Sequence, residues 1–151
     1  MRILDLTAGN RAIWLDRRHP DAVYVDLREG VGPDVVADSG MLPFGQVFGL
    51  VVFDPPHYNA SRNSRMAMSY GHFTAAEIRK LITDGAREAH RVAIPDAVMA
   101  LKWSTKGLVL KSVLPLLLPW WSPLFGTATT QSVQRHLNYW IMLHRVNSPA
   151  E

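Results

Sequence analysis

The sequence predicts an α/β domain with a mostly parallel sheet and helices on both faces. A length of 151 residues suits one domain, which we place over residues 1–151. Short apolar runs alternate with helical patterns, and this alternation requires crossover connections and hence parallel strands. The run Leu50–Phe53 is apolar at every position, as expected of a strand covered on both faces.

The spacing of apolar residues places the individual elements. Strands are predicted at Arg2–Leu6, Ala22–Leu27, Asp34–Ala37, Leu50–Asp54, Ala97–Trp103, Trp121–Thr127 and Tyr139–Arg145. Helices are predicted at Arg11–Arg18, Thr74–Arg91 and Leu108–Leu114.

The long helix has the clearest signals. Thr74 can cap its start, and Glu77 three residues later completes a capping box. An apolar stripe follows at three- and four-residue spacings: Ile78, Leu81, Ile82, Ala86, Ala89 and Val92. Four further aromatics, Trp120, Trp121, Phe125 and Trp140, are interpreted as core.

Composition excludes several classes of protein. Apolar residues make up 48% and charged residues 19%, the balance of a globular domain. Without cysteine there is no disulfide or Cys-zinc site, and the six histidines lack metal-ligand spacing, so we expect no metal and a cytoplasmic location. No signal peptide is visible, and Lys111, Pro115 and Pro119 interrupt the most apolar stretch, which argues against a membrane span. A net charge of +3 permits phosphate contacts without identifying a nucleic-acid binder.

Acidic residues stand at the ends of the first three predicted strands. Asp5 precedes a turn at Gly9, which lets a ligand approach the backbone closely. Asp26 lies where a ribose-binding carboxylate is typical, and Asp38 beside Met41 suits an adenine ring. Each acid alone could be an ordinary turn residue. Their common position at strand ends favours a nucleotide-like ligand.

The fourth strand ends in Asp54-Pro55-Pro56-His57, the most informative stretch. The prolines hold the chain extended and donate no hydrogen bonds, so the Asp54 side chain and the Pro55 carbonyl form a rigid pair of acceptors. Such a pair can accept both hydrogens of a base's amino group and direct the nitrogen lone pair at an electrophile. The alternative is a proline-rich loop without chemistry.

Together these residues resemble the class I S-adenosylmethionine (SAM)-dependent methyltransferases that modify amino groups of nucleic-acid bases, especially small phage and bacterial DNA methylases. The likeness spans nearly the whole chain and rests on Gly9-Asn10-Arg11 with Trp14, Asp26-Leu27-Arg28, Phe53–His57, Tyr70-Gly71, Lys102-Trp103, Leu124-Phe125-Gly126 and Trp140. It departs from the class I pattern at Arg11, where most class I enzymes have a second glycine although the small family tolerates arginine. It also departs at His57, where tyrosine or phenylalanine would stack on a base better than an imidazole.

The resemblance implies a seven-stranded, Rossmann-like sheet whose last strand is antiparallel, with SAM bound across its strand ends. Cofactor contacts are expected from Asp5, Thr7, Ala8, Gly9, Asp26, Leu27, Asp38 and Met41, and catalysis from Asp54, Pro55, Pro56 and His57. Substrate contacts are expected from Tyr58, Arg62, Arg65, Tyr70, Lys102 and Trp103.

The expected target is adenine N6, then cytosine N4, with DNA favoured over RNA as the partner and base flipping required in a duplex. No segment is left for a separate target-recognition domain, so the expectation is either weak sequence discrimination or discrimination supplied by a specificity partner or by the second subunit of a homodimer. Two other hypotheses stay open: methylation of a protein amide, and SAM binding without turnover.

Overall fold

The computed structural model describes residues 1–57, 73–130 and 136–147. Its strands are β1 (Ile3–Asp5), β2 (Ala22–Asp26), β3 (Val35–Val36), β4 (Phe48–Phe53), β5 (Ala93–Ser104), β6 (Trp121–Thr130) and β7 (Leu137–Arg145). Its helices are α2 (Ala75–Val92) and α3 (Leu110–Val113), with 3₁₀ turns η1 (Glu29–Val31) and η2 (Leu114–Leu116).

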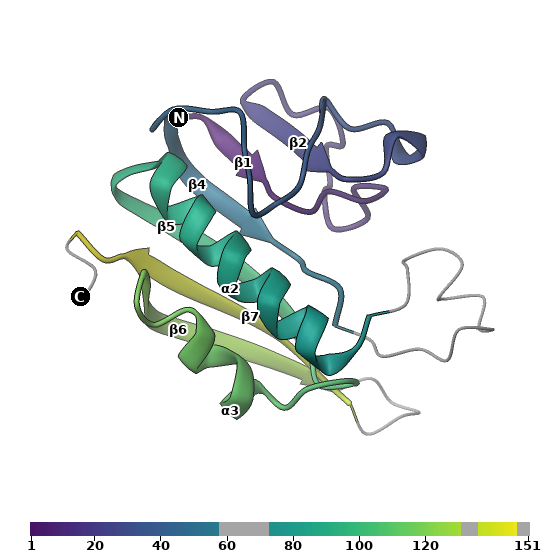
Figure 1. Cartoon of the computed structure of the whole chain (residues 1–151), viewed down its shortest axis with the longest axis vertical. Helices are drawn as coiled ribbons and strands as arrows, with labels where there is room; N and C mark the ends of the chain where they lie inside the picture. The colour runs from purple at the N-terminus through teal and green to yellow at the C-terminus, as the bar shows by residue number, and fades with distance from the viewer. Residues whose placement is uncertain (58–72, 131–135, 148–151) are drawn as a thin grey trace.

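The strands form one seven-stranded mixed sheet in the order β3-β2-β1-β4-β5-β7-β6. The first five pair in parallel, and β7 runs antiparallel to both of its neighbours. All seven predicted strands are present, and the expected Rossmann-like arrangement is confirmed (Figure 1).

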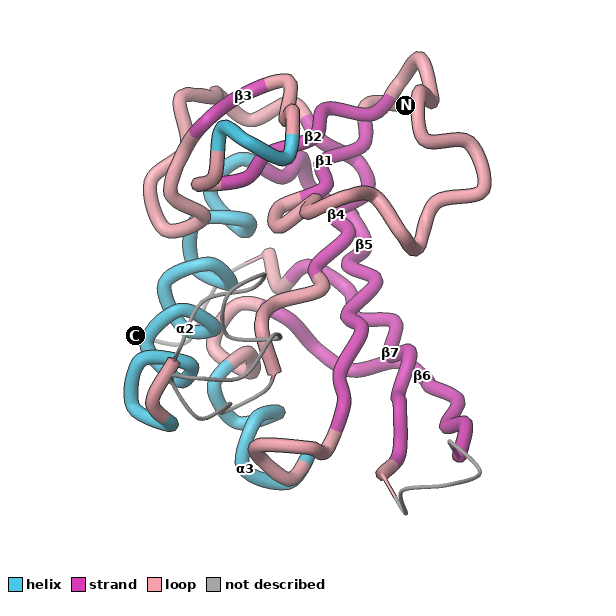
Figure 2. Tube along the Cα trace, turned by 90° about the vertical axis from the view of Figure 1, so that its right-hand side faces the viewer, coloured by secondary structure: helices cyan, strands magenta, loops and turns pink. Residues whose placement is uncertain are grey.

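Helix α2 packs an apolar stripe against the sheet. Its capping box is present: Thr74 Oγ1 accepts from the Glu77 N–H at 3.2 Å, and Glu77 Oε2 accepts from the Thr74 N–H at 2.7 Å. Ile78, Ile82 and the alanines of the stripe are fully buried. Figure 2 shows α2 and α3 on the same side of the sheet, the side that holds the main core, so the α-helix predicted for the other face is not found among the described residues. Among the described residues, no helix has the length and apolar character needed to cross a bilayer.

The predicted helix at 11–18 is wrong: the segment forms consecutive turns. Arg11 has a φ of 58°, which is incompatible with a right-handed helix. Side-chain bonds from Arg11 to the Arg17 carbonyl and from Trp14 to Asp5 hold the segment instead. Leu15 is fully exposed, so no apolar helix face exists here.

The C-terminal half differs from prediction in two ways. The helix predicted at 108–114 is shorter, because four residues of α3 pass directly into the 3₁₀ turn η2 with Pro115 in it. Of the aromatics interpreted as core, Trp121 is buried and donates its indole N–H to the Ala86 carbonyl. Phe125 is 70% exposed and Trp140 36% exposed, so their assignment to the core is wrong.

Candidate functional site

The carboxyl ends of β1, β2 and β4 bring three aspartates to one edge of the sheet. Asp5 pairs in register with Tyr24 and Val52, and Asp26 and Asp54 each lie two residues beyond those partners. Side chains alternate along a strand, so all three carboxylates lie on the same face. Figure 1 shows the arrowheads of these strands pointing the same way. The charges of Asp54 and Asp26 both act on Asp5.

Asp5 is the most deeply buried of the three, at 1% exposed. Its Oδ2 accepts a hydrogen bond from Trp14 Nε1 at 2.6 Å, and its Oδ1 accepts from the Thr7 N–H at 3.4 Å. Burial, reinforced by the charges of the neighbouring carboxylates, raises the pKa of Asp5 to about 7 despite these bonds. A cationic ligand beside Asp5 would therefore stabilise its ionised carboxylate.

The turn after β1 ties the neighbouring strands together. The Ala8 N–H donates to the backbone of β2 at 2.8 Å, and the Gly9 N–H donates to Asp26 Oδ2 at 2.8 Å. On the other side, the Asp54 N–H donates to Thr7 Oγ1 at 3.2 Å. Thr7, Ala8 and Gly9 thus fix the spacing between Asp26 and Asp54.

Arg11 takes a left-handed backbone conformation, which glycine adopts without strain. Its φ of 58° is disfavoured for a residue with a side chain. The guanidinium lies 3.9 Å from the centre of the Tyr24 ring and donates to the Gly32 carbonyl at 2.9 Å, with Asp34 at 3.5 Å. These contacts compensate for the strained backbone.

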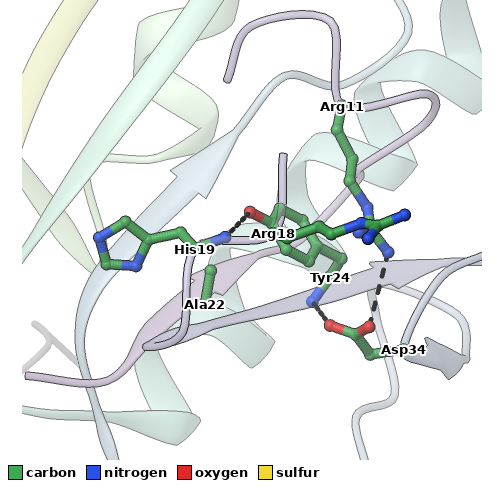
Figure 3. A pocket seen from close by; sticks show the side chains of 6 residues that line it. All are labelled: Arg11, Arg18, His19, Ala22, Tyr24 and Asp34. Carbon is green, nitrogen blue, oxygen red and sulfur yellow. Dashed lines mark hydrogen bonds and ion pairs between the residues drawn. The ribbon is translucent and has the colours of Figure 1, made fainter. Parts of the chain in front are cut away.

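Arg11 also borders an open hollow of about 350 Å³, shown in Figure 3. Its lining residues are Arg11, Arg18, His19, Ala22, Tyr24 and Asp34. None of the residues predicted to bind cofactor or target lines it. Because Arg11 and Asp34 are engaged with each other and with the backbone, we assign the hollow no part in the chemistry.

Asp26 is engaged by Arg28. Arg28 Nε donates to Oδ1 at 2.9 Å and its terminal nitrogen to Oδ2 at 3.2 Å, while the Arg28 N–H also donates to Oδ1. Burial alone would raise the pKa of Asp26, but the hydrogen bonds from Arg28 and Gly9 outweigh it and lower the pKa. Asp26 is therefore a fixed anion at neutral pH. A ribose bound there has to share or replace the bonds from Arg28.

Asp54 is paired with Lys102, whose Nζ lies 2.9 Å from Oδ2. Lys102 stands on β5, the strand beside β4, and both side chains are about one-quarter exposed or less. Lys102, which was predicted to contact the substrate, thus contacts Asp54, the predicted acceptor of the target amine.

The second predicted acceptor, the Pro55 carbonyl, is 3.3 Å from His57 Nδ1. Burial lowers the pKa of His57 and Lys102 lowers it further, while Asp54 opposes both, so the ring is neutral at pH 7. The His57 ring meets Trp103 edge to face, with 6.0 Å between centroids.

Trp103 is fully buried and donates its indole N–H to the Leu108 carbonyl. Trp103 thus presents no exposed surface for its predicted substrate contact, and it supports His57 from within the core.

The remaining cofactor residues predicted after β2 and β3 are exposed. Leu27 is 68% and Met41 78% exposed. Asp38 accepts from the Gly40 N–H at 2.8 Å and shapes the turn that presents Met41. These side chains are accessible to a ligand at the strand ends. The predicted substrate residues Tyr58, Arg62, Arg65 and Tyr70 lie outside the described residues.

Trp14 and Arg28 contact Asp5 and Asp26 directly, a role that was not predicted from the sequence. A signal existed for Arg28: in an extended chain, residues two apart lie on the same side, so Asp26 and Arg28 can pair. Trp14 gave no such signal, because its contact depends on the irregular turns of residues 11–18.

No family model matches the chain, and no curated protein matches it. Solved structures do. The PH0226 protein of Pyrococcus horikoshii OT3 is 13% identical with a TM-score of 0.70, over 96% of this chain and 82% of that one. A SAM-dependent methyltransferase of Methanosarcina mazei is 14% identical with a TM-score of 0.65, over 96% and 92%.

The N-methyltransferase NodS of Bradyrhizobium japonicum WM9, solved with S-adenosyl-L-homocysteine, is 10% identical with a TM-score of 0.64, over 95% and 77%. At these identities the likeness establishes the fold. The chain is built on the Rossmann-like fold of these methyltransferases.

Proposed function

We propose that this chain binds SAM and transfers its methyl group to an exocyclic amino nitrogen of a nucleic-acid base. Adenine N6 is the first candidate and cytosine N4 the second, with DNA favoured over RNA. The observation that carries the proposal is the position of Asp54-Pro55-Pro56-His57 beside Asp5 and Asp26 on one sheet edge. The fold shared with SAM-dependent methyltransferases supports it.

The electrostatics of the edge support a cationic cofactor. Asp26 and Asp54 are paired with Arg28 and Lys102, whereas the raised pKa of Asp5 reflects burial reinforced by repulsion from these two carboxylates, which a cationic ligand would offset. When bound, SAM supplies an activated methyl group on a positively charged sulfur. In the proposal Asp5 faces the methionine amine, Asp26 the ribose hydroxyls, and Asp38 with Met41 the adenine.

Asp54 and the Pro55 carbonyl would then accept the two hydrogens of the target amine. Accepting both hydrogens withdraws the nitrogen lone pair from the ring and fixes its direction. Lys102 and His57 now contact these acceptors, so they orient the pair and are displaced or shifted as the amine enters. The proton released by the nitrogen passes to Asp54 or to water.

The proposal is tested with methyl-labelled SAM and separate pools of DNA, RNA and protein. We expect label in DNA, recovered as N6-methyladenine or N4-methylcytosine after digestion. Label confined to protein, or on ring carbon or oxygen, would refute the amino-base assignment.

An Asp26→Asn variant serves as the cofactor control. It loses the charge that Arg28 and the ribose hydroxyls share, so the Kd for SAM should rise roughly tenfold or more, since a hydrogen bond to a charged group is worth about 1.5–3 kcal/mol. Isothermal titration measures this. An unchanged Kd would remove Asp26 from the ribose site.

A second candidate function is SAM binding without turnover. The pairing of Asp54 with Lys102 and of the Pro55 carbonyl with His57 favours it, since both acceptors are engaged. Tight SAM binding with no labelled product from any pool would support this function over catalysis.

A further inference from the structure

Strand β6 is the free edge of the sheet. Within the part of the chain that the structure describes, it is the last strand in the order and pairs only with β7 (Figure 1). Every residue of Ser122–Thr129 is exposed. An edge strand directs alternate N–H and C=O groups outward, and these groups fit the backbone of another strand.

Among the described residues, little protects this edge against pairing. Proteins block exposed edges with charged side chains, short strands, prolines or bulges. β6 is ten residues long and contains no charged residue. Pro123 and the register shift before Phe125 disturb only its first part, and the register is unbroken from Phe125 to Thr130. The regular, uncharged part of β6 is therefore competent to pair.

An apolar sheet face adjoins this edge. Phe125 pairs with Met142, and Met142 with Ala100, so the three form a row across β6, β7 and β5. Trp140 lies next to this row on the same face, two residues before Met142. We call Phe125, Met142, Ala100 and Trp140 the open face.

The open face lies opposite the helices. Figure 2 shows α2 and α3 on the other side of the sheet. The burial pattern agrees: along β5 and β7, Met99, Leu101, Ile141 and Leu143 are buried, whereas the residues of the open face are partly or largely exposed. Large exposed apolar patches usually mark binding surfaces.

We propose that two copies of this chain associate through β6, antiparallel about a twofold axis, so that their sheets join and their open faces become continuous. A second copy fits this edge for a reason of charge. Twofold pairing sets each strand against its own sequence, so any charged residue near the axis would face a like charge. β6 offers only apolar, small and hydroxyl side chains.

In such a dimer, each copy would carry one candidate site. β5 and β6 both run antiparallel to β7. The end of β6 near Thr129 therefore lies beside the carboxyl ends of the parallel strands, where the aspartates are. Antiparallel pairing of two β6 strands reverses the strand direction between the two copies. The two sites therefore face opposite ways along the strands of the joined sheet. The proposal goes beyond the proposed function and does not depend on it.

The absence of cysteine makes the pairing directly testable. Single cysteines are placed along the edge, as Ser122→Cys, Phe125→Cys, Thr127→Cys and Thr129→Cys, and the full-length variants are oxidised gently. Identical residues approach each other only at the axis, and a disulfide needs Cα atoms about 4.4–6.8 Å apart. We expect one position to crosslink at least tenfold faster than the one farthest from it. Absent or uniform crosslinking along β6 would overturn the proposal.

Sedimentation of the full chain provides the second measurement. We expect a mass twice the 16.9 kDa of one chain. Phe125→Lys should raise the dimer Kd at least tenfold, because it places like charges near the axis at an exposed position that tolerates lysine. Val36→Lys, at the exposed opposite edge strand β3, is the matched control and should remain dimeric. A monomeric wild type, or equal dimerisation of both lysine variants with native circular dichroism, would contradict the proposal.

Discussion

At the scale of single residues, the site is defined by the burial of each aspartate and by the hydrogen-bond donors around it. Asp26 receives hydrogen bonds from Arg28 and Gly9 and is held as an anion, whereas Asp5 is buried with two uncharged donors and titrates near neutrality. The identity of the acids was predictable from their positions at strand ends. Their partners were not, because pairing across strands depends on register and side-chain rotamers.

Asp5 should make stability fall as pH rises from about 4 to about 7. Its pKa is raised from 3.8 to about 7 on folding, so within this window the native chain keeps a proton that the unfolded chain loses. The loss is on the order of a few kcal/mol and stops above the folded pKa.

Urea unfolding at pH 5 and pH 8 measures the effect. The fall between the two should be distinctly smaller in Asp5→Asn, which cannot ionise. Asp16→Asn, at an exposed turn, is the matched control and should behave as wild type. Equal pH dependence in Asp5→Asn and wild type would show that Asp5 titrates normally.

Arg11 presents a conflict between backbone and side chain. Arg11→Ala keeps a left-handed residue and removes its contacts with Tyr24 and Gly32, whereas Arg11→Gly removes the same contacts and relieves the backbone strain. We expect both to be less stable than wild type, with the glycine variant more stable than the alanine variant by about 1 kcal/mol. Denaturant titration compares the three, and an alanine variant at least as stable as the glycine variant would argue against backbone strain.

At the scale of elements, predictions succeeded where local signals and tertiary packing agree. Helix α2 has a cap, an apolar stripe and a sheet to cover, and it was predicted almost to its ends. The segment 11–18 has none of these supports, since its form is set by the left-handed Arg11 and by long-range bonds to Asp5 and Gly32. Phe125 and Trp140 were misplaced because apolar type alone does not reveal that one sheet face lacks a described helix.

The capping box provides a test of local control. Thr74→Ala removes the acceptor of the Glu77 N–H and should cost about 1 kcal/mol of unfolding free energy. Thr74→Ser retains a hydroxyl and should lose far less. The two variants are compared by urea unfolding. A serine variant as unstable as the alanine variant would mean that the hydroxyl does not cap the helix.

At the scale of the whole molecule, the strand order converts scattered sequence positions into one site. Asp5, Asp26 and Asp54 are up to 49 residues apart in the chain, and they meet because β1 lies between β2 and β4. The alternation of apolar runs predicted the parallel sheet, and parallel strands place their carboxyl ends together. What the alternation does not specify is the engagement of both predicted acceptors, by Lys102 and by His57.

The central claim is that Asp54 acts on the target amine and has no part in holding the cofactor. It is tested most directly by measuring the Kd for SAM and the rate of methyl transfer in Asp54→Ala beside wild type. We expect a Kd within about threefold of wild type and a rate at least about 100-fold lower, because a positioned acceptor is lost. Transfer at the wild-type rate, or a loss of activity fully explained by weaker SAM binding, would contradict it.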